Sequence, residues 1–124
     1  MKWPRRILAA LAPSALLVAA IVIPASQASA TRGYFTTASP CLRMHSAPDS
    51  ATFVEGCLNK GTQIDISCQI RNTGTPTANV NGSTIWDQIV WTSQTGDLPA
   101  GFWVSDYYTT TPVFNGFSPG LDQC

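Results

Sequence analysis

The stretch CLRMHSAPDSATFVEGCLNKGTQIDISCQ, residues 41–69, contains three of the four cysteines of the chain, and its turns predict how they pair. Between two apolar segments lies the sequence APDS, residues 47–50, in which proline presets the first turn angle and aspartate bonds to its own backbone. A hairpin centred near Asp49 places Cys41 opposite Cys57, so that their Cα atoms come within the about 7 Å that a disulfide requires. We therefore predict a disulfide between these two cysteines.

The fourth cysteine, Cys124, ends the chain. An even number of cysteines in a short exported chain predicts two disulfides, for which four cysteines allow three connectivities. The next turn, residues 59–61, lies two residues after Cys57 but seven before Cys68, so these two cysteines are out of register across it. By elimination, Cys68 is predicted to pair with Cys124, which ties the carboxyl terminus to a central strand.

The first 30 residues have the order of a secretory signal peptide, with basic residues, an apolar run over 7–23 and a small-residue ending at 28–30. The apolar run is shorter than the ~20 residues that span a bilayer, so we expect cleavage after Ala30 and no membrane contact afterwards. The predicted location is extracellular, with cell-wall association left open. Residues 31–124 are then expected to form a single domain, because they are too few for two.

The exported part of the chain is mildly acidic. After residue 30 it has four basic side chains against seven acidic ones, a formal net charge of −3. A nucleic-acid-binding protein needs a cluster of basic side chains to neutralise phosphates, and here they are scattered. We therefore expect no nucleic-acid partner, and we expect a monomer.

Residues 31–124 lack the apolar periodicity of helices and are rich in threonine, isoleucine, valine and aromatic residues, which predicts an all-β fold. Within residues 64–68, Ile, Ile and Cys alternate with Asp and Ser, so one face of that strand is expected to be apolar and the other wet. The dipeptide Asn81-Gly82 predicts a tight turn. Residues 71–77 and 93–100 are predicted to be loops. The predicted strands are 34–38, 41–46, 52–58, 63–69, 78–80, 84–91 and 101–104.

The stretch GFWVSDYY, residues 101–108, contains four aromatic side chains. Phe102 and Val104 lie on one side of the predicted strand, facing the core, and Trp103 lies on the other. Burial of one aromatic ring removes about 150 to 250 Å² from water, which at ~25 cal/mol per Å² is worth several kcal/mol. A domain this small needs most of its large rings for stability, and those predicted in the core are Trp86, Trp91, Phe53 and Phe102.

With strands, turns and cysteines placed, the chain resembles the bacterial SH3-like domain, SH3b, in its secreted, disulfide-bearing form. The resemblance is carried by the stretch 41–69, by IWDQI at 85–89 and by WVSDYY at 103–108. It covers a core of residues 36–108, followed by a disulfide-tethered tail of residues 109–124. It implies a small SH3-like barrel of five or more antiparallel strands with two disulfides.

Three positions of the opening motif depart from the family's pattern. The glycine of its turn is Ala47 here, and its asparagine and arginine positions are occupied by Arg43 and His45. The fold implied by the resemblance is compatible with these changes, whereas they weaken any transfer of the family's ligand contacts to this chain.

The resemblance implies a secreted, noncatalytic binding module for cell-wall peptidoglycan or a peptide. An SH3-like barrel presents its ligand groove near the closing turn, so the candidate ligand-binding residues are Trp103, Tyr107 and Tyr108. The alternative is a secreted protein–protein interaction or inhibitor protein that acts on another extracellular protein through the loops 71–77 and 93–100.

The residues offer little for catalysis. His45 is the one histidine and is predicted to lie on the surface of a strand, and the four thiols are assigned to disulfides. Asp87 and Asp106 are the candidates for a glycosidase-like carboxyl pair, but Asp106 is expected to cap the turn of residues 105–108. The chain has no C-x-x-C motif for zinc. We expect no enzymatic activity, no cofactor and no metal.

Overall fold

The computed structural model describes residues 31–124, so the predicted signal peptide and its cleavage point lie outside the described residues. This part of the chain is all-β, as predicted, with six strands and two short 3₁₀ helices. The strands are β1 (Thr31–Phe35), β2 (Cys41–His45), β3 (Val54–Asn59), β4 (Gln63–Arg71), β5 (Ile85–Thr92) and β6 (Gly96–Ser105). The 3₁₀ helices are η3 (Pro76–Ala78) and η4 (Asp106–Tyr108).

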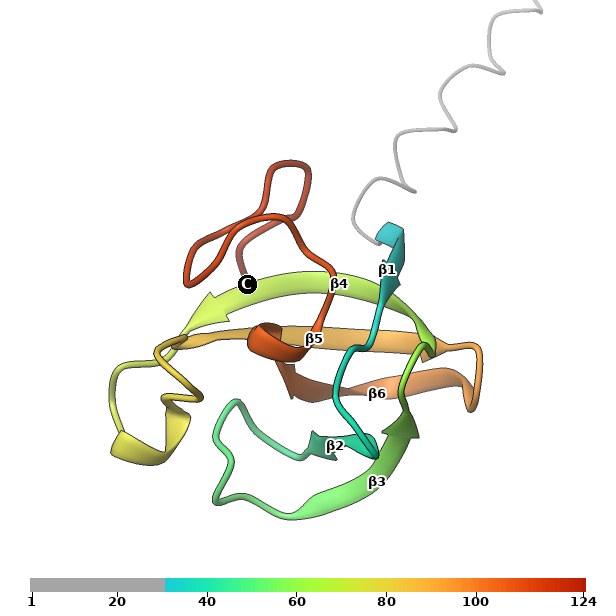
Figure 1. Cartoon of the computed structure of the whole chain (residues 1–124), viewed down its shortest axis with the longest axis horizontal. Helices are drawn as coiled ribbons and strands as arrows, with labels where there is room; N and C mark the ends of the chain where they lie inside the picture. The colour runs from blue at the N-terminus through green and yellow to red at the C-terminus, as the bar shows by residue number, and fades with distance from the viewer. Residues whose placement is uncertain (1–30) are drawn as a thin grey trace, which may run out of the picture.

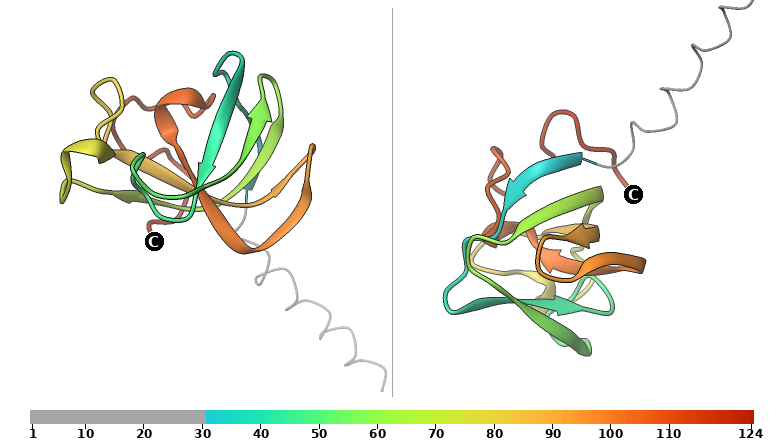
Figure 2. Two further views of the ribbon diagram at one scale, coloured as in Figure 1. Left: turned by 90° about the horizontal axis from the view of Figure 1, so that it is seen from below. Right: turned by 90° about the vertical axis from the view of Figure 1, so that its right-hand side faces the viewer.

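The six strands form one antiparallel sheet in the order β1-β4-β5-β6-β2-β3 (Figure 1). The expectation of five or more antiparallel strands is therefore confirmed. The strand hydrogen bonds do not close the sheet into a ring, because β1 and β3 each have a strand neighbour on one side only. In the right-hand view of Figure 2, β1 and the β2–β3 hairpin lie at opposite ends of the curled sheet, with β4 to β6 between them.

The main apolar core takes side chains from five of the strands, from the β1–β2 connection and from the tail. Its buried members are Ala38, Leu42, Met44, Leu58, Ile64, Ile66, Ile89, Leu98, Val104 and Leu121. Val104 is fully buried and Phe102 packs against this core, as their shared side of β6 predicts. Burial of these side chains provides the hydrophobic stabilisation of the fold.

The aromatic rings are less uniformly buried than predicted. Of the four rings expected in the core, Trp86 is fully enclosed and Phe102 is partly buried. Trp91 is also partly buried, with the Arg32 guanidinium 3.9 Å from its ring centroid. Phe53 is 69% exposed, so its prediction is wrong. It directly precedes β3, an edge strand, and a sheet edge has no second neighbour to cover such a ring.

The two disulfides pair as predicted. Cys41 is bonded to Cys57, with their Cα atoms 5.5 Å apart, and Cys68 is bonded to Cys124, with their Cα atoms 5.0 Å apart. The first bond links the two strands of the β2–β3 hairpin. The second bond links the last residue of the chain to β4, which is a central strand of the sheet as expected.

The register of the β2–β3 hairpin differs from the predicted one by two residues. Cys41 pairs with Asn59 and Arg43 pairs with Cys57, so the disulfide joins diagonal neighbours instead of facing ones. The loop turns later than predicted, because the Thr52 amide donates a hydrogen bond to the Asp49 carbonyl oxygen at 3.1 Å. The cysteine pairing is therefore right although the register argument behind it is not.

The prediction of a strand at residues 78–80 is wrong. It lies at the end of η3 and forms only a single bridge, between Val80 and Ser83. The turn prediction there is confirmed, because Asn81 and Gly82 have φ angles of 51° and 94°, the left-handed values that this turn requires.

The loop predicted at residues 93–100 is shorter in the structure. Thr92 pairs with Gly96, so a tight turn connects β5 directly to β6, and residues 96–100 belong to the strand.

Strand β4 is not simply apolar on one face and wet on the other. Ile64 and Ile66 are fully buried, as predicted, but Asp65 is buried as well. Strand β1 pairs along this part of β4 and covers it, and the Arg32 Nε lies 3.2 Å from an Asp65 carboxylate oxygen. Further along β4, Gln69 has no exposed surface at all.

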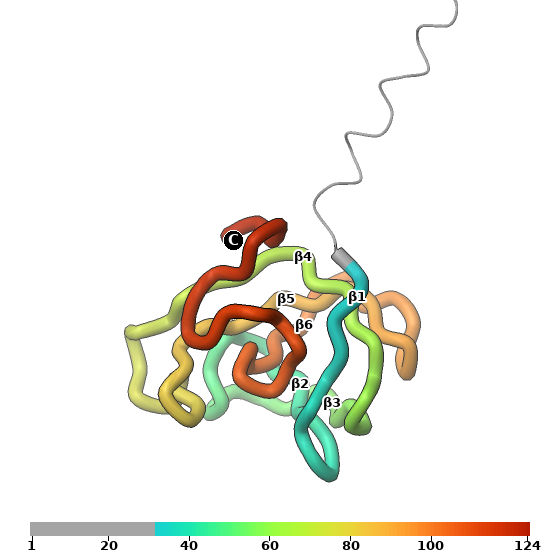
Figure 3. The backbone as a smooth tube through the Cα atoms, turned by 45° about the horizontal axis from the view of Figure 1, so that its top comes forward, coloured from blue at the N-terminus to red at the C-terminus, as the bar shows by residue number. Residues whose placement is uncertain are grey.

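The tail of residues 109–124 passes over the outer side of β4, where Figure 3 shows it in red. The Gln69 amide donates to the Asp122 carbonyl oxygen at 2.8 Å, and the Cys124 amide donates to the Gln69 carbonyl oxygen at 2.9 Å. The tail is thus bound to β4 by backbone hydrogen bonds as well as by the disulfide.

Candidate ligand-binding site

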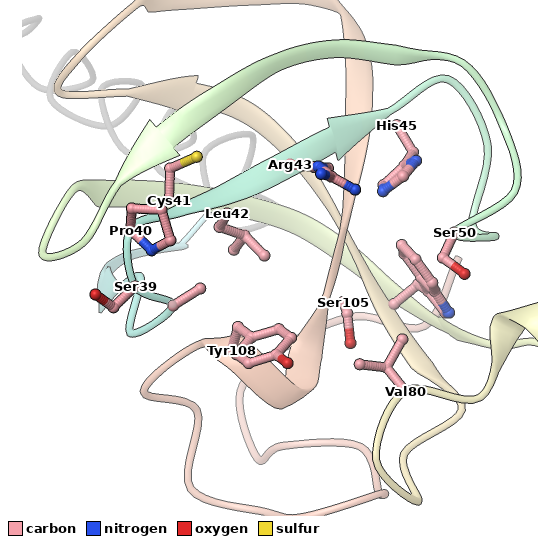
Figure 4. Close-up of a pocket in the computed structure, with 12 residues that line it drawn as sticks. Ser39, Pro40, Cys41, Leu42, Arg43, His45, Ser50, Val80, Ser105 and Tyr108 are labelled. Carbon is pink, nitrogen blue, oxygen red and sulfur yellow. The ribbon is translucent and has the colours of Figure 1, made fainter.

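A pocket of about 310 Å³ opens between strand β2 and the 3₁₀ helix η4 (Figure 4). Arg43 and His45 face it from β2, while Val80, Ser105 and Tyr108 lie on the opposite side. The other lining residues are Ala38, Ser39, Pro40, Cys41, Leu42, Ser50 and Trp86. Mostly apolar walls with a few polar groups are the usual composition of a small-ligand pocket.

Strand β2 places both of the basic side chains of the pocket. Alternate residues of a strand point to the same face, so Arg43 and His45 share one face while Met44, between them, is buried in the main core. Arg43 is exposed at the mouth of the pocket, whereas His45 is only 6% exposed. The pocket therefore has a cation at its mouth and an imidazole in its interior.

The prediction that His45 lies on the strand surface is wrong. At His45 strand β2 pairs with β6, opposite Trp103, so this end of β2 is covered by a neighbouring strand. Its ring meets that of Trp86 edge to face, with the centroids 5.6 Å apart. Its Nδ1 atom lies 3.2 Å from the Thr52 carbonyl oxygen.

This contact determines what the imidazole offers to a ligand. A carbonyl oxygen can only accept a hydrogen bond, so Nδ1 carries the proton, and in the neutral ring Nε2 is an acceptor. The Nε2 atom has no hydrogen-bond partner within residues 31–124. His45 therefore brings a free acceptor to the pocket.

The charge of the pocket is opposite to that of the domain around it. None of the lining residues is acidic, although residues 31–124 have a net charge of −3. In the described part of the chain the one ion pair joins Arg32 to Asp65, so the Arg43 guanidinium has no carboxylate partner there. A guanidinium presents its donors in a planar fork that fits a carboxylate or a phosphate. Arg43 is therefore available for an anionic group of a ligand.

Hydrogen bonds hold the two large aromatic rings of the pocket. The Trp86 Nε1 donates to the Ala78 carbonyl oxygen at 2.9 Å, and the Tyr108 hydroxyl accepts from the Asn81 side-chain amide at 3.1 Å. These bonds orient the rings before a ligand enters, which lowers the entropy that binding must overcome.

Only one of the three predicted ligand-binding residues reaches this pocket. Tyr108 lines it, whereas Tyr107, which is 40% exposed, lines a neighbouring pocket of about 160 Å³ together with Phe114. Trp103 lies on β6, pairs with His45 and Gln88, and lines neither pocket. The structure thus does not bring these three side chains together.

Sequence reasoning missed Arg43 and His45 as pocket residues, although a signal was present. Both occupy positions at which the chain departs from the SH3b pattern, and both interrupt an otherwise apolar strand, CLRMH. Their shared face became informative only once the strands on either side of β2 were known.

A second group of polar side chains lies buried beneath the tail. The Gln69 side-chain amide donates to a carboxyl oxygen of Asp87 at 2.8 Å and to one of Asp106 at 3.1 Å. Its own oxygen accepts from the Ser118 amide at 2.8 Å. Gln69 therefore joins two carboxyl groups that are 19 positions apart in the sequence to the tail that covers them.

The prediction that Asp106 caps the turn of residues 105–108 is wrong. The Ser105 hydroxyl caps η4 by accepting from the Tyr107 amide at 3.3 Å. The Asp106 carboxylate points inward instead, and one of its oxygens accepts from the Thr109 and Thr111 hydroxyls. Burial explains the difference, since a carboxylate with several buried donors is better satisfied inside than at the exposed end of a turn.

The carboxyl pair also perturbs the titration of Asp87. Burial, followed by the negative charge of Asp106, raises the pKa of Asp87 well above its usual value. Asp87 is fully buried and Asp106 is 4% exposed, so in this structure no sugar reaches the two carboxyls that were considered as a glycosidase-like pair. Their arrangement is that of a buried structural cluster.

No model of a known protein family matches the chain, and a comparison with curated proteins also finds no match. The fold and the site define the class instead: a disulfide-bonded all-β protein with a pocket that is lined by Arg43 and has no acidic lining residue. Two disulfides are typical of proteins outside the reducing cytoplasm. Across residues 31–124 no helix is long and apolar enough to cross a membrane, and no three potential metal ligands are grouped.

Proposed function

We propose that this protein is a secreted, noncatalytic binding module of the SH3-like type, which recognises cell-wall peptidoglycan or a peptide through the pocket at Arg43. The observation that carries the proposal is a guanidinium without a carboxylate partner, at a pocket free of acidic residues, in a domain of negative net charge. An arginine left in this state is suited to an anionic group supplied by a ligand.

Three further features support this function. Peptidoglycan combines sugars with short peptides that carry free carboxylates, so it offers both an anion for Arg43 and groups that stack on Tyr108. The six-stranded antiparallel sheet has the strand content of an SH3-like barrel. The predicted signal peptide, together with two disulfides, fits a protein that meets cell walls after export.

The first test is retention of the exported protein on purified peptidoglycan. We expect Arg43→Gln to weaken retention by about tenfold or more, because a hydrogen bond to a charged group is worth about 1.5–3 kcal/mol. Lys60→Gln is the matched control, since it removes the same charge from the exposed β3–β4 turn and leaves the pocket intact. Retention no greater than that of an unrelated disulfide-bonded protein would contradict the proposal.

The second test separates the two neighbouring pockets. We expect Tyr108→Ala to reduce retention on peptidoglycan, whereas Tyr107→Ala, on the same 3₁₀ helix, leaves it nearly unchanged. Near-ultraviolet circular dichroism checks that each variant keeps its fold. The reverse order of effects would move the site to the smaller pocket at Phe114.

The alternative function, protein–protein interaction or inhibition, predicts a different result. The protein would then not be retained on peptidoglycan, and it would capture a protein partner from culture supernatant. Arg43→Gln would leave that capture unchanged if the partner bound elsewhere on the surface.

A further inference from the structure

The two basic residues of β2 offer opposite hydrogen-bonding groups to the same pocket. The Arg43 guanidinium can only donate, and the neutral His45 ring, with its Nδ1 proton directed at the Thr52 carbonyl oxygen, can only accept at Nε2. The two residues are two positions apart on one strand, which places their Cα atoms about 6.6 Å apart along it. A ligand that satisfies both must carry an anionic acceptor and a donor close to each other.

This combination excludes several simpler ligands. A sulfate ion has acceptor oxygens on every side, and one of them would face the unprotonated His45 Nε2. An uncharged sugar would donate to Nε2 but would leave the guanidinium without an anion. The terminal residue of a peptide has both groups, because its carboxylate can accept from Arg43 while its backbone N–H donates to His45.

The remaining walls fit the rest of such a residue. Leu42, Val80 and Trp86 are apolar, and Tyr108 adds an aromatic ring. A volume of about 310 Å³ is at the lower end of the range of small-ligand pockets, roughly 300 to 1,000 Å³. The pocket is therefore suited to one or two residues and not to a long chain.

We propose that this pocket recognises the carboxyl-terminal residue of a peptide, with its carboxylate on the Arg43 guanidinium, its backbone N–H on His45 Nε2 and its side chain against the apolar wall. The inference rests on the proposed function and deepens it, because it names the part of a cell-wall peptide that is bound.

The first experiment compares purified peptidoglycan with the same material after its free carboxylates have been converted to methylamides. We expect retention of the exported protein to fall by about tenfold on the amidated material, as for the loss of one charge-assisted hydrogen bond. The Arg43→Gln variant should be retained equally weakly on both. Equal retention of the unmodified protein on both materials would overturn the inference while leaving the proposed function standing.

The second experiment does not depend on binding to peptidoglycan. The exported protein is titrated with N-acetylalanine, N-acetylalaninamide and acetate while the Arg43 and His45 side-chain resonances are followed by NMR. We expect N-acetylalanine to bind at least about tenfold more tightly than either of the others, since each of them lacks one of the two contacts. Lys60→Gln should keep this preference, and Arg43→Gln should lose it.

The outcomes of the titration are distinct. Binding of the amide as tightly as the acid would overturn the carboxylate contact, and binding of acetate as tightly as N-acetylalanine would overturn the N–H contact to His45. Absence of any shift at Arg43 with all three probes would overturn the inference as a whole. Another outcome is that the protein prefers N-acetylalanine in the titration and yet is not retained on peptidoglycan. In that case the pocket recognises peptide termini, and the cell-wall part of the proposed function is wrong.

Discussion

Replacing Cys68 and Cys124 together by serine is expected to lower the free energy of unfolding by about 4 kcal/mol, because their disulfide closes a loop with a sequence separation of 56 residues. Native proteins are stable by only about 5–15 kcal/mol, so this loss removes a large part of the stability. Urea unfolding of the purified protein, followed by tryptophan fluorescence, measures the difference.

Replacing Cys41 and Cys57 by serine is the matched comparison. Their sequence separation is only 16 residues, for which the expected loss is about 3 kcal/mol. An equal or larger loss for this second pair would contradict the assignment of the tail disulfide as the more important one.

The tail disulfide also has a local effect that the other bond lacks. The tail supplies the Ser118 amide to the Gln69 side chain and the Asp122 carbonyl to its backbone, so opening the tail exposes the polar cluster beneath it. We expect faster hydrogen exchange at the amides of Gln69 and Ser118 in the variant without Cys68 and Cys124. Unchanged protection at both amides would show that backbone hydrogen bonds hold the tail without the disulfide.

Asp87→Asn is expected to stabilise the protein at neutral pH by about 1–3 kcal/mol, the usual cost of a buried polar group without a partner. One Asp87 carboxyl oxygen has no hydrogen-bond partner within residues 31–124, and the pKa of the group is raised by burial and by Asp106. An asparagine keeps the oxygen that accepts from Gln69, carries no charge and can donate toward Asp106.

The pH dependence of this effect has a definite sign. Because the pKa of Asp87 is higher in the folded than in the unfolded chain, the protonated group stabilises the fold fully only below the unfolded pKa of about 3.9. That stability is lost as the pH rises through the folded pKa. The Asp87→Asn variant should lack this decline, so its advantage grows from acid to neutral pH.

Urea unfolding at a series of pH values measures this dependence, and two variants serve as controls. Asp97→Asn removes an exposed carboxylate and should have little effect. Asp106→Ala should destabilise the fold, because it removes the oxygen that accepts from Gln69, Thr109 and Thr111. If Asp87→Asn is less stable than the unmodified protein at neutral pH, the conclusion that the charged, buried Asp87 carboxyl destabilises the fold is wrong.

The fold class and the disulfides were predictable because they depend on local patterns. Period-two alternation, the Asn81-Gly82 turn and the spacing of cysteines around residues 47–50 are read within a few residues, and each reflects a local steric preference. The predicted pairing of Cys41 with Cys57 is correct although the predicted register is wrong by two residues. Diagonal neighbours in the hairpin still lie within disulfide range.

The errors at Phe53 and His45 have one cause, which is the order of the strands in the sheet. Strand β3 follows β2 and precedes β4 in the chain, yet it forms an edge of the sheet, so Phe53 is left uncovered. Strand β2 pairs with β6 at His45, which encloses a side chain that looks solvent-facing in its own hairpin.

The sequence alone therefore determined the all-β class, the two disulfides and the presence of aromatic residues near the closing turn, because these follow from short-range geometry and residue chemistry. Only the tertiary structure decided that Arg43, His45 and Tyr108 share a pocket and that Asp87 and Asp106 share a buried cluster. Both sites join strands that are distant in the chain, and the long-range pairing that unites them leaves no local pattern in the sequence.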